Sequence, residues 1–115
     1  MVKVVGKKMV ATVIGDIDIK RADNFWRRLK GLLGKKCLNA NTALLITPCN
    51  SVHTFAMQFS IRLICLDKQG RIIQVVNELL PNRIFVAHRD TYEILEFSTQ
   101  TLPIDESLVG AVFYL

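Results

Sequence analysis

Two apolar stretches separated by a short turn constrain the fold of this chain more than any other feature. Residues 61–66 and 71–76 are rich in aliphatic and β-branched side chains, and residues 67–70 (Asp-Lys-Gln-Gly) join them. A four-residue connection ending in glycine is typical of a hairpin whose type I turn is followed by a left-handed residue. Apolar side chains occupy both faces, which is typical of strands covered on both sides. The pattern therefore predicts central strands in a sandwich, a closed barrel or a sheet with a helix across it.

Five further stretches have the composition of short strands: residues 9–14, 17–20, 43–47, 93–97 and 112–115. One helical pattern stands apart from them, because Phe25, Leu29 and Leu32 fall on one face between a candidate N-cap, Asp23, and a candidate terminator, Gly34. The sequence predicts an α+β fold, mostly β: a compact barrel- or sandwich-like sheet of about seven short strands with one N-terminal amphipathic helix. We expect a single domain over residues 1–115.

Composition limits the classes to which the protein can belong. Half of the 115 residues are hydrophobic and 22% are charged, which argues against disorder. No segment reaches the roughly 18 apolar residues of a membrane span. The three cysteines (Cys37, Cys49 and Cys65) are odd in number and form no Cys-x-x-Cys pair, which argues against a disulfide framework or a structural zinc site. We expect a cytoplasmic protein with reduced thiols.

Residues 48–59 concentrate polar and reactive side chains between apolar segments. Buried polar atoms cost free energy unless they are partnered, so this concentration predicts a site. In an extended segment His53 and Met57 share one face while Thr54 points to the other. We expect a binding pocket formed by His53, Thr54 and Met57, with Glu96 as one candidate partner for the imidazole. A histidine that is hydrogen-bonded for purely structural reasons is the alternative.

Cys49 and His53 also suggest an enzyme. A nucleophilic thiol needs an imidazole within hydrogen-bond reach and a third group that orients the ring. No such group lies nearby in the sequence, although the fold could supply Glu96, Asp90 or Glu93. A small buried cysteine is the commoner role. Cys49, His53 and Met57 are soft or borderline metal ligands, but residues four apart on a strand are separated by roughly 13 Å, too far to share an ion. A turn at residues 50–51 could bring Cys49 towards His53 and would leave Met57 out. We favour a non-catalytic binding or accessory module and expect no metal and no cofactor.

A basic segment suggests a third function. Residues 20–36 hold seven basic side chains against one acid, Asp23, in a chain of net charge +5. Trp26 lies among them, and Trp with Arg can bind phosphates and stack on bases. Arg27, Arg28 and Lys30 are the candidate anion-binding residues, for nucleic acid or for an anionic membrane surface. A solvated helix face is the structural alternative. A small-molecule or protein partner, and a monomer or a homodimer, all fit the sequence.

Several motifs together resemble one known family: residues 28–34 (RLKGLLG), 43–49 (ALLITPC), 51–57 (SVHTFAM), 66–73 (LDKQGRII) and 95–97 (LEF). In this combination the chain resembles the family called domain of unknown function 192, and the resemblance covers nearly everything from Ala22 onward. It implies a compact β-rich single domain with one N-terminal helix, of the kind found in small prokaryotic proteins. It implies no reaction.

The chain departs from the family pattern at three places. The family usually has an Asp where Arg62 stands, a Gly where Ser98 and Thr99 stand, and an Asp where Ala111 stands. The change at Arg62 reverses the local charge. If the two acids belong to a shared site, this member has lost or altered that site.

Overall fold

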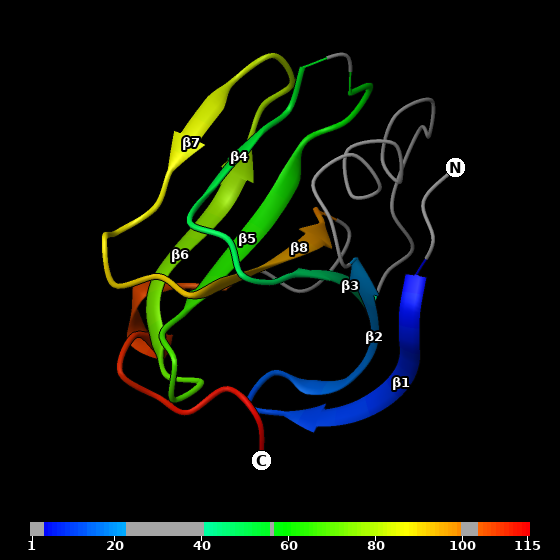
Figure 1. Cartoon of the computed structure of the whole chain (residues 1–115), viewed down its shortest axis with the longest axis vertical. Helices are drawn as coiled ribbons and strands as arrows, with labels where there is room; N and C mark the ends of the chain where they lie inside the picture. The colour runs from blue at the N-terminus through cyan, green and yellow to red at the C-terminus, as the bar shows by residue number, and fades with distance from the viewer. Residues whose placement is uncertain (1–3, 23–40, 56, 100–103) are drawn as a thin grey trace.

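The computed structural model of the chain describes residues 4–22, 41–55, 57–99 and 104–115. Six strands form one sheet in the order β1-β2-β3-β8-β5-β6, and β4 pairs with β7 in a second sheet (Figure 1). β2 and β3 run parallel, and the other paired strands run antiparallel. The elements are β1 (Val4–Thr12), β2 (Gly15–Ala22), β3 (Thr42–Ile46), β4 (Ser51–His53), β5 (Ile61–Leu66), β6 (Ile72–Leu79), β7 (Ile84–Val86), β8 (Glu93–Ser98) and the 3-10 helix η1 (Glu106–Leu108).

The large sheet is buried on both faces at its centre. On β5, Leu63 and Cys65 belong to a first core, whereas Ile64 and Leu66 belong to a second core on the opposite face. The first core includes Val52 of β4, so the small sheet covers that face of the large one. The second core includes Ile104 and Phe113 from the C-terminal segment. These contacts confirm the prediction of a central, doubly covered strand for residues 61–66. The same prediction for residues 71–76 is wrong, because β6 lies at the edge of the large sheet.

The hairpin turn also forms as expected. Gly70 has a φ of 78°, which is the left-handed conformation that glycine adopts without a steric penalty. The Oδ1 atom of Asp67 accepts hydrogen bonds from the backbone N–H groups of Gln69 (2.9 Å) and Arg71 (3.0 Å). The side chain thus fixes the turn from within.

Three expectations about strands need correction. The sequence predicts no strand between residues 78 and 90, but strand β7 forms there and pairs with β4. The terminal strand expected at 112–115 is wrong, because that segment makes only isolated bridges, from Val112 to Arg71 and from Tyr114 to Thr12. The described strands number eight rather than about seven. They do not close a barrel through their ladders, and the C-terminal segment bridges β1 and the start of β6 (Figure 1).

The described residues confirm a mostly β fold. The helix predicted from Asp23 to Gly34 lies outside them and stays a prediction, so the α+β assignment rests on that helix. No helix among the described residues is long and apolar enough to cross a membrane.

Candidate functional site

His53 lies on the outer face of the small sheet rather than in a pocket of the core. It is half-buried, whereas its neighbour Val52 is buried in the first core, as alternation along β4 requires. Its ring stacks on Phe55, with centroids 4.9 Å apart and an interplanar angle of 29°. Its Nδ1 atom accepts a hydrogen bond from the backbone N–H of Phe55 (3.4 Å). The cross-strand neighbour of His53 is Ile84 of β7.

Met57 does not share this face. β4 ends at His53, and the backbone N–H of Met57 donates to the carbonyl of Thr54 (3.2 Å), which turns the chain. Met57 is buried in the first core. The expected extended segment therefore ends too early to place His53 and Met57 side by side.

Thr54 is fully buried and holds the connection between β6 and β7. Its Oγ1 atom donates to the carbonyl of Leu80 (2.6 Å) and accepts from the backbone N–H of Arg83 (2.9 Å). Its own backbone N–H donates to the Arg83 carbonyl, and its carbonyl accepts from the N–H of Asn82, both at 2.9 Å. Because each of these bonds joins the end of β4 to residues 80–83, the geometry supports an anchoring role for Thr54.

Cys49 lies near a second thiol in the first core. Its Sγ atom donates to the carbonyl of Ser51 (3.0 Å). Cys49 and Cys65 are both buried, and both belong to the first core. Burial, and then the nearby Cys49 thiol, raise the pKa of Cys65 to about 12. A thiol with that pKa stays protonated and unreactive near neutral pH.

Glu96 is buried on β8 between Leu44 of β3 and Leu63 of β5, its partners in the two ladders. Both leucines belong to the first core, which places the carboxyl group on the face that the small sheet covers. Glu96 and His53 therefore lie on different layers of the molecule.

Arg62 has a structural role in this chain. Its Nη1 atom donates to the carbonyl of Asn77 and its Nη2 atom donates to the carbonyl of Thr99, both at 2.7 Å. The guanidinium group thus joins β5 to β6 and to the residue that follows β8. At another departure from the family pattern, Ala111 packs partly buried against the second core.

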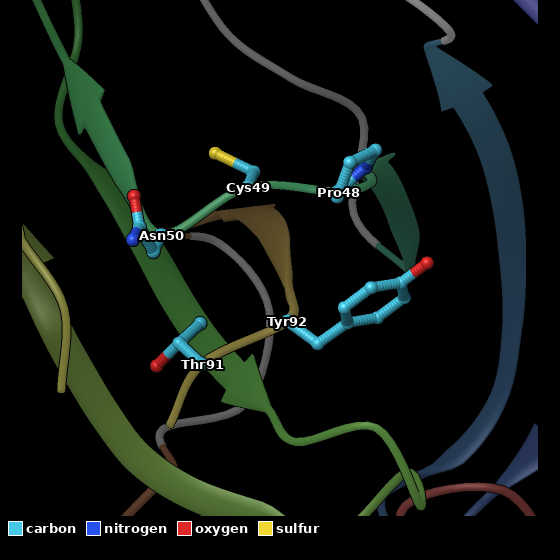
Figure 2. A pocket seen from close by; sticks show the side chains of 5 residues that line it. All are labelled: Pro48, Cys49, Asn50, Thr91 and Tyr92. Carbon is cyan, nitrogen blue, oxygen red and sulfur yellow. The ribbon is translucent and has the colours of Figure 1, made fainter. Parts of the chain in front are cut away.

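A groove lies where the loop before β8 meets the β5–β6 turn. It consists of two adjoining cavities that share Thr91 and Tyr92. The smaller cavity, of about 240 Å³, is also lined by Pro48, Cys49 and Asn50, which face Thr91 and Tyr92 across it (Figure 2). The larger, of about 550 Å³, is also lined by Asp67, Lys68, Gln69, Ile73, Arg89 and Asp90. We call the two cavities together the Thr91 groove.

Backbone hydrogen bonds hold the walls of the Thr91 groove in place. The N–H of Tyr92 donates to the carbonyl of Leu66 (2.8 Å), and the carbonyl of Tyr92 accepts from the N–H of Cys49 (2.7 Å). The N–H of Thr91 donates to the carbonyl of His88, whose own N–H donates to the Gln74 side chain, both at 2.9 Å. The groove is therefore preorganised by β5 and β6.

The hydroxyl of Thr91 has no hydrogen-bond partner in the part of the chain that the structure describes. The residue is only 8% exposed, so bulk solvent does not satisfy the oxygen atom either. A buried hydroxyl left unsatisfied costs about 1–3 kcal/mol. Such an atom at the wall of a groove marks a position where a bound polar group would recover that free energy.

Two cations line the groove without ion pairs in the described part of the chain. Lys68 places its Nζ atom 6.0 Å from the centroid of the Tyr92 ring, and Arg89 is exposed. Two acids line the same cavity. The Oδ1 atom of Asp67 accepts hydrogen bonds within the hairpin turn, and the backbone N–H of Asp90 donates to Nδ1 of His88 (3.1 Å). Because Lys68 and Arg89 form no ion pair with either acid, they are available to an anionic group.

A metal site and an anion-binding helix are the other site types that the sequence raises. These residues contain no group of three His, Cys, Asp or Glu side chains that could hold a metal ion. Arg27, Arg28 and Lys30, the candidate anion-binding residues, lie outside the described ranges, so that role stays a prediction.

Sequence reasoning missed most of the groove. The groove residues form no sequence motif. They approach one another only because β5 and β8 are neighbours in the sheet, and they include Lys68, Arg89, Thr91 and Tyr92. The one usable signal was the Asp67-to-Gly70 turn, which fixes the position of Lys68.

Comparison with known families identifies the family of this chain. The profile of DUF192, described as Uncharacterized ACR, matches residues 7–103. The chain belongs to this family. The match confirms the resemblance seen in the sequence, and it assigns no activity to the DUF192 domain. A comparison with curated proteins finds no match.

Two solved structures share the fold. A protein of unknown function from Novosphingobium aromaticivorans superposes with a TM-score of 0.67 at 15% identity, over 84% of this chain and 74% of that one. A candidate transcription regulator from Sinorhizobium meliloti superposes with a TM-score of 0.66 at 14% identity, over 82% of this chain and 83% of that one. At these identities the likeness concerns the fold alone.

Proposed function

We propose that this DUF192 protein is a small non-catalytic binding module that takes an anionic small molecule in the Thr91 groove. The observation that carries the proposal is that Thr91, a residue lining both cavities, has a buried hydroxyl without a hydrogen-bond partner among the described residues. A ligand oxygen that accepts a hydrogen bond from this hydroxyl would remove its desolvation cost.

The charges at the groove support an anionic ligand. Lys68 and Arg89 line the larger cavity and have no ion-pair partners among the described residues. Guanidinium and ammonium groups bind carboxylate and phosphate oxygens through charge-assisted hydrogen bonds. The Tyr92 ring supplies an apolar face for the rest of the ligand. A ring-bearing carboxylate or phosphate fits this combination.

The proposal relocates the pocket expected from the sequence. Thr54 and Met57 are buried and His53 lies on the outer face of β4, so their contacts support architecture rather than one shared pocket. The Cys49–His53 enzyme gains no support, because the Cys49 thiol donates to Ser51. The part of the predicted stretch that reaches the groove is its beginning, residues 48–50.

An NMR titration tests the proposal with benzoate and phenyl phosphate as probes and with benzamide as their neutral counterpart. We expect saturable shifts at the amides of residues 67–69 and 89–92 with both anions and not with benzamide. Lys68→Gln and Arg89→Gln should each weaken binding by roughly tenfold. Arg83→Gln, which removes an exposed charge outside the groove, is the matched control. No saturable shift, or an equal response to benzamide, would refute an anion site.

Thr91→Val separates a ligand-binding hydroxyl from a structural one. Valine keeps the shape and removes the unsatisfied oxygen, so the melting temperature should stay constant or rise slightly while anion affinity falls. A clear loss of stability in this variant, with unchanged affinity, would show that the hydroxyl supports the fold instead.

A further inference from the structure

The outer strand of the small sheet presents apolar side chains to solvent. Ile84 and Val86 of β7 are 67% and 73% exposed, although β-branched residues of this size are usually buried. Between them, Phe85 packs partly buried against the first core. β7 is therefore attached to the molecule by one face and open on the other, and Figure 1 shows it at the outside of the fold.

The free edge of β7 also presents backbone groups. Within the described residues β7 pairs only with β4, and its register sets Phe85 opposite Val52. The carbonyl of Arg83 accepts from the N–H of Thr54, and the N–H of Ala87 donates to the carbonyl of Asn50, both at 2.9 Å. Thr54 and Asn50 flank β4, so these two groups of the β7 segment point toward β4. Because bonding directions alternate along an antiparallel strand, the N–H and C=O groups of Ile84 and Val86 point to the outer edge.

Two aromatic rings extend this surface on the same face. His53 is the cross-strand neighbour of Ile84, and Phe55, which is 44% exposed, stacks on the His53 ring. We call His53, Phe55, Ile84 and Val86 together the β7 edge surface. It combines an unpaired strand edge with a contiguous apolar face, which are the two elements that strand addition requires.

We infer that the β7 edge surface docks an extended peptide segment of a partner protein, which adds as a third strand beside β7. The outward N–H and C=O groups of Ile84 and Val86 would bond its backbone, and the apolar face would contact alternate side chains of the segment. Arg83 lies at one end of β7 and Arg89 beyond the other, and both are exposed on a chain of net charge +5. The segment is therefore apolar at alternate positions and acidic at its ends.

A second copy of this chain fits the surface less well. Self-pairing would bring together two basic strand ends from chains that each carry +5. The edge comprises only Ile84–Val86, a length of roughly 10 Å, whereas stable dimers bury about 1,200–2,000 Å². A short acidic strand has neither difficulty.

The test uses a fluorescein-labelled peptide of alternating valine and threonine with glutamates at both ends. Its controls are the same peptide with lysine ends and the same peptide with N-methylated backbone amides. We expect saturable anisotropy with the acidic peptide, NMR shifts at residues 53, 55 and 84–86, and weaker binding for both controls. Val86→Pro removes an outward N–H without removing a bond to β4, so it should cost roughly tenfold in affinity.

Matched variants separate binding at the β7 edge surface from a general effect of added charge and from binding in the Thr91 groove. Ile84→Lys should abolish binding, whereas Met9→Lys, which puts the same charge on an exposed residue of edge strand β1, should not. Lys68→Gln and Thr91→Val, which test the Thr91 groove, should leave peptide binding unchanged, so the two proposals fail separately. The inference is overturned if the peptide fails to bind, if Val86→Pro binds it equally, or if sedimentation shows concentration-dependent dimers that Ile84→Lys disrupts.

Discussion

Strands β5 and β7 contain similar residues but meet very different surroundings. Leu63, Ile64 and Leu66 of β5 are completely buried, whereas Ile84 and Val86 of β7 are mostly exposed. The difference follows from sheet order, since β5 has β6 and β8 as neighbours, whereas in the described part of the chain β7 pairs only with β4. Apolar content therefore does not distinguish a strand that stabilises the fold from one that is free to bind. The number of covered faces and paired edges does.

The largest expected effect tests the stabilising role of β5. Leu63→Ala should lower the free energy of unfolding by about 2–5 kcal/mol, because it removes buried methyl groups and leaves a cavity in the first core. Urea denaturation monitored by circular dichroism measures the change. The matched variant is Ile84→Ala on β7, which should change stability by less than about 0.5 kcal/mol. Equal losses in the two variants would show that β7 carries as much of the core as β5 does.

A smaller effect tests how β7 is held in place. Thr54→Val removes the hydroxyl that donates to Leu80 and accepts from the Arg83 N–H, and it leaves both backbone groups without that partner. The cost should be about 1–3 kcal/mol. Hydrogen exchange should show faster exchange at residues 82–87, while amides of β5 and β8 keep their protection. Faster exchange spread evenly over all strands would contradict a local anchoring role.

The sequence predicted the centre of this fold better than its periphery. The alternation of Leu63 and Cys65 against Ile64 and Leu66, and the glycine at position 70, are local signals, and both were confirmed. The pairing of β7 with β4 depends instead on contacts between residues about 30 positions apart in the chain, such as Thr54 with Arg83. No local pattern encodes such contacts.

The candidate site shows the same contrast between features with a local sequence signal and features that depend on long-range contacts. Residues 48–59 were singled out for their chemistry, and the structure distributes them over three environments. Cys49 borders the Thr91 groove, Thr54 is a buried anchor, and His53 lies on the outer face. The turn after β4 causes this separation. The groove itself depends on loops brought together by the sheet, so Thr91 had no sequence signal that distinguished it from any other threonine.

The smallest expected effect concerns Glu93, the half-buried residue at the N-terminal end of β8. Burial raises the pKa of its carboxyl group above the ordinary value of 4.5, although a hydrogen bond with Thr47 and the charge of Arg21 partly oppose this. Since the folded state holds this proton more tightly than the unfolded state, stability from this group falls as pH rises through the window above 4.5. The ionised carboxylate is the unfavourable form in the fold.

Glu93→Gln removes this titration and isolates its contribution. The variant should melt close to the wild type at pH 4 and above it at neutral pH, so the difference in melting temperature should grow as pH rises. Tyr114 gives a second readout, because burial and then the charge of Glu93 raise the pKa of its hydroxyl to about 12. Ultraviolet titration of the variant should find a lower Tyr114 pKa. A difference in melting temperature that shrinks with pH would mean that the contacts of Glu93 with Thr47 and Arg21 outweigh its burial. The end of β8 would then be stabilised by charge, unlike the apolar strands on either side of it.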